Sequence, residues 1–272
     1  NVQAVEATNT QDSVLVYGSN GAKIKIADSG SATLKHGLTM TGATVDSKVS
    51  TTNKKDTGAV YATGSGTEIT LDRTALPTTA NISITGAKLT DDQKFVGFAF
   101  MAADGAVVNA KNNKIELTNG STTAAATGTG SKVNLQGSDI LYNGDGYAVY
   151  SDGDGEIDLR NNAKLTLQGK STAFDLDLGS STPPIKLDST TRIEVDSDDV
   201  VVFNLKNASG LHSTNLANSI TTAISSKLSG ISLGSLVTGI NGHNNYKIAA
   251  ADGGTISIGN LDRSGTASST TQ

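Results

Sequence analysis

The chain has 272 residues, a formal net charge of −5, no cysteine and no tryptophan, and only 36% of its residues are hydrophobic. The lack of cysteine excludes a disulfide scaffold and any thiolate-ligated metal site. Because the chain has no run of lysine or arginine and no apolar stretch of roughly 18 to 20 residues, we expect no nucleic-acid partner and no membrane insertion by this segment.

The N-terminal part of the chain lacks the features of a signal peptide and contains two weak repeat units. Its first ten residues, NVQAVEATNT, have neither a basic start nor an apolar stretch, so we expect a mature product or a piece excised from a larger protein. In each weak unit a glycine is followed three and five residues later by isoleucine or leucine. These residues are Gly21, Ile24 and Ile26 in 13–37, and Gly66, Ile69 and Leu71 in 58–71.

Residues 97–169 contain three consecutive units that repeat every 25 residues. When the units are aligned on a glycine, apolar residues recur at two later positions that are themselves two residues apart. The glycines are Gly105, Gly130 and Gly155; the first apolar set is Ile115, Ile140 and Leu165; the second is Leu117, Tyr142 and Leu167. Residues two apart lie on the same face of a strand. We therefore predict that each set of three stacks in one column.

This period predicts the fold. A unit of about 25 residues with two or three short strands, and no room for a helix between them, is typical of one coil of a right-handed parallel β-helix. The expected class is thus all-β, a β-helical solenoid with a short α-helical insertion near the C-terminal end. Such a solenoid needs only a narrow core, which fits the low hydrophobic content. A β-sandwich stays open as an alternative, although it predicts no fixed period.

The turn SDGDGE at 151–156 has carboxylates at alternate positions, as a calcium loop does. The equivalent turns of other units read GSNG, GSGT, AADG and GTGS, so the shared feature is glycine and not carboxylate. An EF-hand loop aligned on Asp152 and Asp154 would have Tyr150 and Asn161 at its first and last ligand positions, and neither fits. We predict a solvated turn in which glycine supplies positive φ, with no metal and no cofactor.

The unit at 172–195 has Pro183 and Pro184 in place of the turn glycine and overlaps the densest group of acids. These acids are Asp175, Asp177, Asp188, Glu194, Asp196, Asp198 and Asp199. Asp175 and Asp177 alternate with apolar residues, which indicates outward, solvated positions on a strand. A glycan-cleaving enzyme would need acids or bases clustered on successive coils, and the three histidines are scattered. We therefore expect no enzyme.

The repeat is interrupted at 206–245, where no turn glycine occurs at the expected place. Apolar residues recur there every four positions, as in one stripe of an amphipathic helix. They are Leu216, Ile220, Ile224 and Leu228. We predict a helix at 213–229, with Ser213 as N-cap and Gly230 just past its end. Residues 233–240 follow, either as a second short helix or as contacts between the first helix and the solenoid.

Two roles are open for this insertion. Its apolar stripe can cap the solenoid core, or the insertion can project and bind a partner, since recognition tends to lie on what interrupts a regular stack. Under the second hypothesis the available polar residues are Asn215, Asn218, Thr221, Thr222, His243, Asn244 and Asn245.

Residues 246–261 return to the repeat pattern, with Gly254 followed by Ile256 and Ile258 at strand spacing. The interruption and the return together divide the chain into three parts. We predict β-helix coils at 1–205, a helical and loop insertion at 206–245, and a further coil with a C-terminal tail at 246–272.

The units GAVYATGSGTEITL (58–71) and GYAVYSDGDGEIDLRNNAKLTLQG (146–169) resemble the passenger repeats of type V autotransporters of Gram-negative bacteria. The resemblance covers most of 13–205 and returns at 246–261. It implies a β-helix that is secreted through the outer membrane and displayed on the cell surface or released, usually as an adhesin. The family's C-terminal membrane barrel is not in this sequence, so the resemblance also implies a piece of a larger, barrel-anchored protein.

Three functions are therefore weighed. We expect a monomeric adhesin fragment that binds a host-cell surface protein or glycan, or a receptor on a neighbouring cell. A purely structural β-helix stalk fits the repeat but gives no reason for the insertion at 206–245. A glycan-active β-helix enzyme fits the fold but lacks an acid and base arrangement in the sequence.

Overall fold

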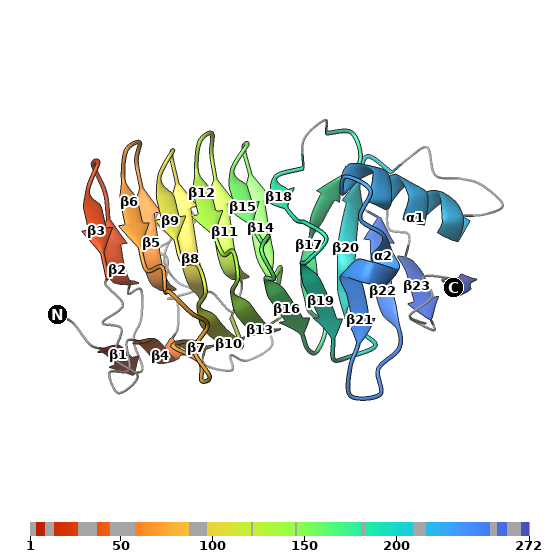
Figure 1. The fold of residues 1–272 in the computed structure, drawn as a ribbon, viewed down its shortest axis with the longest axis horizontal. Helices are drawn as coiled ribbons and strands as arrows, with labels where there is room; N and C mark the ends of the chain where they lie inside the picture. The colour runs from red at the N-terminus through yellow and green to blue at the C-terminus, as the bar shows by residue number, and fades with distance from the viewer. Residues whose placement is uncertain are drawn as a thin grey trace, which may run out of the picture.

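The protein is seen in a computed structural model, and its described residues form parallel sheets that run along the molecule, with two helices near the C-terminal end (Figure 1). The structure describes residues 4–8, 14–26, 37–43, 58–86, 97–120, 122–144, 146–180, 183–208, 216–250, 255–259 and 268–271. No helix within these ranges is long and apolar enough to cross a membrane.

Successive strands enter three sheets in turn, so that one circuit of the three makes one coil of a parallel β-helix. Sheet A contains β1 (Ala4–Thr8), β4 (Gly37–Ala43), β7 (Ile82–Gly86), β10 (Lys114–Thr118), β13 (Asp139–Asn143), β16 (Lys164–Leu167), β19 (Arg192–Val195) and β21 (Val237–Gly239). Sheet B contains β2 (Val14–Gly18), β5 (Gly58–Thr63), β8 (Phe98–Ala103), β11 (Thr122–Thr127) and β14 (Val149–Asp152). Sheet C contains β3 (Lys23–Lys25), β6 (Glu68–Thr70), β9 (Val107–Asn109), β12 (Lys132–Asn134), β15 (Glu156–Asp158) and β18 (Ile185–Lys186).

A fourth sheet, sheet D, continues sheet B toward the C-terminal end. It contains β17 (Thr172–Asp177), β20 (Val201–Lys206), β22 (Tyr246–Ala250), β23 (Thr255–Gly259) and β24 (Ser268–Thr271). β22 pairs in parallel with β20, but β23 and β24 pair antiparallel. The region 246–272 therefore differs from the further coil that we predicted: one strand extends the stack and the chain then folds back on it. Gly254 lies outside the described residues.

The strand register confirms the predicted columns. Ile115 is opposite Ile140, and Ile140 is opposite Leu165. The second set, Leu117, Tyr142 and Leu167, pairs in the same register. All six side chains are buried. Because parallel in-register pairing places equal positions of successive coils side by side, the 25-residue period becomes a continuous apolar core.

One alignment made from the sequence is wrong by one residue. Lys132 pairs with Glu156, so the residue that occupies the place of Gly130 in the fifth coil is Asp154 and not Gly155. Asp154 has a φ of 66°, and Gly130 has a φ of 82°. Gly155 is needed for a different reason, because a Cβ there would lie 2.2 Å from the carbonyl oxygen of Ala126. Aspartate tolerates the left-handed region better than most residues.

Buried hydroxyl groups join neighbouring coils at the turn that precedes sheet C. The Oγ1 of Thr67 accepts a hydrogen bond from the backbone N–H of Gly21, at 3.0 Å, and donates to the carbonyl of Thr63. Ser131 repeats the arrangement two coils later, accepting from the N–H of Gly105 at 2.9 Å. Gly21 and Gly105 thus have their N–H donors satisfied by the next coil, which stabilises the stack at its corner.

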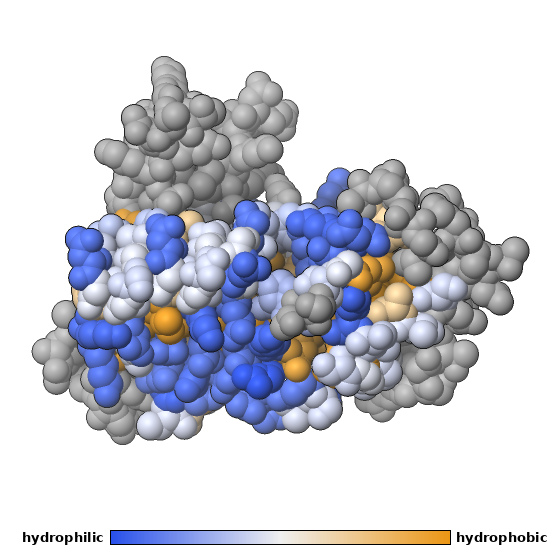
Figure 2. Space-filling view, turned by 90° about the horizontal axis from the view of Figure 1, so that it is seen from above, coloured by the Kyte–Doolittle hydropathy of each residue, from blue (hydrophilic) through white to orange (hydrophobic). Residues whose placement is uncertain are grey.

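The outward face of sheet C is a ladder of opposite charges. Lys23 lies 3.1 Å from Glu68, and Glu156 lies between Lys132 and Lys186 at 3.8 and 3.7 Å. Opposite charges directly across neighbouring strands stabilise a sheet modestly. Figure 2 looks onto the edge that carries the tips of these coils, which is mostly hydrophilic, with hydrophobic side chains gathered toward the end that carries α1.

The two helices occupy the place in the chain where the seventh coil would have its strand in sheet C. α1 (Leu216–Lys227) and α2 (Leu233–Leu236) lie between β20 and β21. Ile220, Ile224 and Leu228 are buried in the main core, which confirms the apolar stripe and supports the capping role; the side chain of Leu216 is outside the described residues. Gly230, with a φ of 83°, donates to the carbonyl of Ser225 just past the helix end, as predicted. Ser213 is also outside the described residues.

Candidate functional site

Sheets B and D meet between β14 and β17, where the ladder of backbone pairs is interrupted. Tyr147 forms a bridge with Thr172, which aligns sheets B and D along one face. Past that bridge, the described strands β14 and β17 share no ladder of backbone pairs, and the two sheets separate. In the sixth coil Pro183 and Pro184 also stand in place of the turn glycine, in the connection from β17 to β18.

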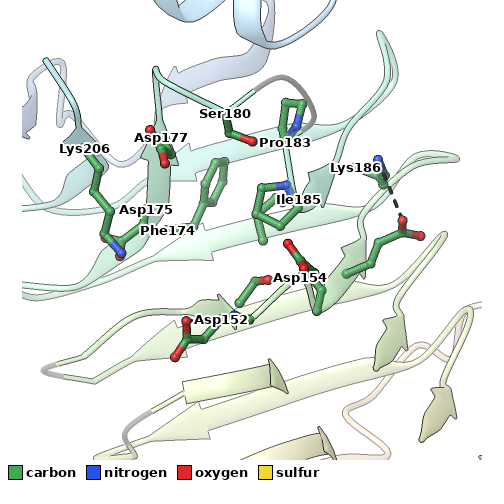
Figure 3. A pocket seen from close by; sticks show the side chains of 15 residues that line it. Asp152, Asp154, Phe174, Asp175, Asp177, Ser180, Pro183, Ile185, Lys186 and Lys206 are labelled. Carbon is green, nitrogen blue, oxygen red and sulfur yellow. Dashed lines mark hydrogen bonds and ion pairs between the residues drawn. The ribbon is translucent and has the colours of Figure 1, made fainter. Parts of the chain in front are cut away.

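A groove with a volume of about 320 Å³ lies at this break. One wall is the turn between β14 and β15, with Asp152 and Asp154. The other wall is β17 and the segment after it, with Asp175, Asp177 and Pro183. Figure 3 shows Asp154 pointing from its turn toward the proline segment, and Asp175 lying close to Lys206 at the end of the groove. The groove therefore has acids on both walls.

The charges in the groove are only partly paired. Lys206 Nζ lies 2.6 Å from Asp175 Oδ2, and this hydrogen-bonded carboxylate raises the pKa of Lys206. Asp177 accepts hydrogen bonds from the side chain of Asn207 and the N–H of Gly179, which lower the pKa of its carboxyl group. Asp154 is exposed and has no partner among the described residues. The groove therefore presents free acceptor oxygens and a net negative charge.

Two tyrosines lie beside the groove on the outward face. The rings of Tyr147 and Tyr150 are 6.1 Å apart between centroids, and both residues are half-buried. The Nδ2 of Asn204 donates to the hydroxyl of Tyr147 and to Asp175, at 2.9 Å each, which fixes the ring in place. Burial and the nearby carboxylate of Asp175 raise the pKa of Tyr147. The phenol therefore stays protonated at neutral pH and remains a hydrogen-bond donor.

Tyrosine is concentrated on this one face of the solenoid. The chain has six tyrosines, of which Tyr142 and Tyr246 are buried in the core. Tyr17, Tyr61 and Tyr150 stand in one column of sheet B, which passes through Met101 and Ala125. The column thus has aromatic residues at both ends, and only the end at Tyr150 borders the groove.

The residues predicted to bind a partner do not form one surface. Asn215 lies outside the described residues, as does the side chain of Asn218, although the latter residue is in α1. Thr221 is half-buried and Thr222 is exposed on α1. His243, Asn244 and Asn245 lie in the connection from β21 to β22, which is at the opposite edge of the molecule from α1 in Figure 1. His243 Nδ1 is 3.4 Å from Asp198 Oδ1.

The helical insertion contacts one wall of the groove through Lys227. Lys227, in the last turn of α1, donates a hydrogen bond of 2.7 Å to the carbonyl oxygen of Ser180, which lines the groove. The helix that caps the core therefore also holds the wall that contains Pro183. The sequence placed Asp175 and Asp177 correctly on an outward strand face, but it gave no sign that Asp154 would lie across from them. In the sequence, the pair Pro183 and Pro184 was the one sign that the sixth coil differs from its neighbours.

Among the described residues, no group of three or more histidine, aspartate or glutamate side chains is placed to hold a metal ion. The lowered pKa of Asp177 makes this carboxyl group an acceptor and not a proton donor at neutral pH. Compared with protein-family models, curated proteins and solved structures, the chain matches none of them.

Proposed function

We propose that the chain is the binding module of a cell-surface adhesin, a fragment of an autotransporter passenger that meets its partner through the outward face at the junction of sheets B and D. The observation that carries the proposal is the pair Tyr147 and Tyr150, held beside Asp175 and Asn204 at the mouth of a groove. Aromatic rings supply contact area with little loss of entropy, and fixed polar groups around them supply specificity.

The solenoid suits this role because its coils fix the positions of surface side chains. Backbone ladders hold β11 and β14 in register, and the hydrogen bonds of Asn204 order Tyr147 before any partner arrives. A partner then binds without the cost of ordering the site. On this proposal the protein acts as a monomer outside a bacterial cell, either released or anchored through an outer-membrane barrel. Its partner is a host-cell protein or glycan, or a receptor on a neighbouring cell.

The two alternatives receive less support. A structural stalk gives no reason for half-buried tyrosines with ordered polar partners on an outward face. A glycan-cleaving enzyme needs one carboxyl group that keeps its proton and a second that is charged. In the groove Asp177 has a lowered pKa, and Asp175 is held by Lys206.

The test compares two matched pairs of tyrosines. The labelled chain is added to cultured epithelial cells and to bacteria, and its apparent Kd is measured by flow cytometry. Replacing Tyr147 and Tyr150 by alanine should weaken binding at least tenfold, since each lost ring removes contact area and specific hydrogen bonding. The control replaces Tyr17 and Tyr61, which lie in the same face away from the groove, and should change the Kd by less than about twofold. Equal binding by the two variants would contradict the proposal.

A further inference from the structure

The groove has the size of a small ligand site. Its volume of about 320 Å³ is at the lower end of the range of roughly 300 to 1,000 Å³ for pockets that hold small molecules. Tyr150 does not line the groove, but its hydroxyl lies next to Asp152, which does. A ligand that extends from the groove past Asp152 would therefore reach this ring.

The polar groups that face the groove are mostly acceptors. Asp154 has no partner among the described residues, and Asp152 accepts a hydrogen bond from the N–H of its neighbour Gly153 and lies next to the Tyr150 hydroxyl. An ionised carboxylate can accept hydrogen bonds but cannot donate them. The complementary ligand must therefore bring several donors, and a set of adjacent hydroxyl groups does so.

The negative charge of the groove disfavours the binding of an acidic ligand. Its two lysines are already paired, Lys206 with Asp175 at 2.6 Å and Lys186 with Glu156 at 3.7 Å. Asp152 and Asp154 form no ion pair with either lysine, and Asp177 is influenced by Lys206 only at longer range. A carboxylate, sulfate or phosphate on a ligand would meet these like charges, and like charges at an interface select against a partner.

From these observations we infer that the groove between β14 and β17 is a subsite for a non-anionic saccharide, an inference that rests on the proposed binding function. A pyranose ring has one face of C–H groups, which can pack against Tyr150, and hydroxyl groups at its edge, which can donate to Asp152 and Asp154. The tyrosine pair supplies contact and the acids select a neutral sugar over a sialylated, sulfated or uronic one.

The experiment uses the whole chain on an array of paired glycans, each neutral glycan printed with its sialylated and sulfated forms. We expect binding to neutral members and at least tenfold weaker binding to the acidic forms. The substitution Asp154→Asn keeps a residue that tolerates positive φ but removes the charge and one acceptor. It should weaken binding to the neutral glycan by about tenfold.

The matched control is Asp104→Asn. Asp104 has a φ of 53° in the equivalent turn two coils earlier and does not line the groove, so its substitution should change the affinity by less than about twofold. A preference for sialylated or sulfated glycans, or unchanged binding by the Asp154 variant, overturns the saccharide inference and leaves the adhesin proposal standing. Cell binding that survives enzymatic removal of surface glycans does the same. If the chain binds neither cells nor glycans, the proposed function itself fails.

Discussion

Lys227 donates a hydrogen bond of 2.7 Å to the carbonyl oxygen of Ser180, so the last turn of α1 is tied to the wall of the groove. The two residues are far apart in sequence and belong to different coils of the solenoid. The helix thus has two roles in one element: its apolar stripe covers the core, and its terminal lysine holds the segment that follows β17. The cap and the groove are therefore physically connected.

This contact predicts a variant that changes binding without unfolding the chain. Lys227→Met keeps the aliphatic part of the side chain and removes its donor. We expect the groove wall to loosen and the affinity for the ligand to fall roughly three- to tenfold, with a melting temperature within about 3 °C of the parent chain. Lys170→Met, at an exposed lysine in the turn before β17, is the control and should alter neither quantity. Equal affinities of the two variants would contradict this prediction.

The core column predicts a large difference between two neighbouring positions of β13. Ile140 is fully buried between Ile115 and Leu165, whereas Leu141 faces outward and is half-buried. Ile140→Asp places an unpaired charge in the core and should lower the free energy of unfolding by about 4 kcal/mol. Leu141→Asp should lower it by less than about 1 kcal/mol. Urea denaturation followed by circular dichroism measures both, and similar midpoints would contradict the observed register.

The columns could be predicted from the sequence because their signal is the sum over many coils. When apolar pairs recur every 25 residues, equivalent apolar side chains of successive coils must stack on one another. A shift of one residue in the alignment of a single turn does not change this prediction. Single turns carry less information. In the segment DGDG (152–155) the sequence does not show which residues adopt positive φ. In the structure Gly153 and Asp154 both do, and the pairing of Lys132 with Glu156 places Asp154 level with Gly130.

The groove could not be predicted for a related reason. It arises where a regular ladder ends, between β14 and β17, and the sequence shows this only as two prolines in place of a glycine. The segment after β17 is also held by a contact that the sequence does not show, the hydrogen bond from Lys227 to the carbonyl oxygen of Ser180. The described members of the predicted partner set lie at two edges of the molecule, with Thr221 and Thr222 on α1 and His243, Asn244 and Asn245 in the connection from β21 to β22 (Figure 1).

Asp158 predicts how stability depends on pH. Burial alone would raise the pKa of this carboxyl group, but hydrogen bonds from Arg160 and Gln136 outweigh burial and lower it below 3.8. The folded state therefore holds this proton less tightly than the unfolded chain. Its contribution to stability is complete above the unfolded pKa and is lost as the pH falls through the folded pKa. In Asp158→Asn, the free energy of unfolding should fall less steeply between about pH 4.5 and pH 2 than in the parent chain.

The control for this prediction is Asp154→Asn, at an exposed carboxylate with no partner among the described residues. It should leave the acid slope close to that of the parent chain. Urea titrations at steps of half a pH unit give the slopes directly. A steeper acid slope in the Asp158 variant would mean that the carboxyl group is destabilised in the folded state and that the sign given above is wrong.

The final prediction separates the two roles of the helical insertion by comparing its two faces. Ile224 is fully buried in the core and Thr222 is exposed on the opposite side of α1. Ile224→Ala leaves a cavity under the cap and should lower the free energy of unfolding by about 2 to 4 kcal/mol, whereas Thr222→Ala should change it by less than about 0.5 kcal/mol. If α1 is a cap and not a docking surface, Thr222→Ala should also bind cells as the parent chain does. A loss of cell binding in this variant, with unchanged stability, would restore the exposed face of the helix as the site of partner recognition.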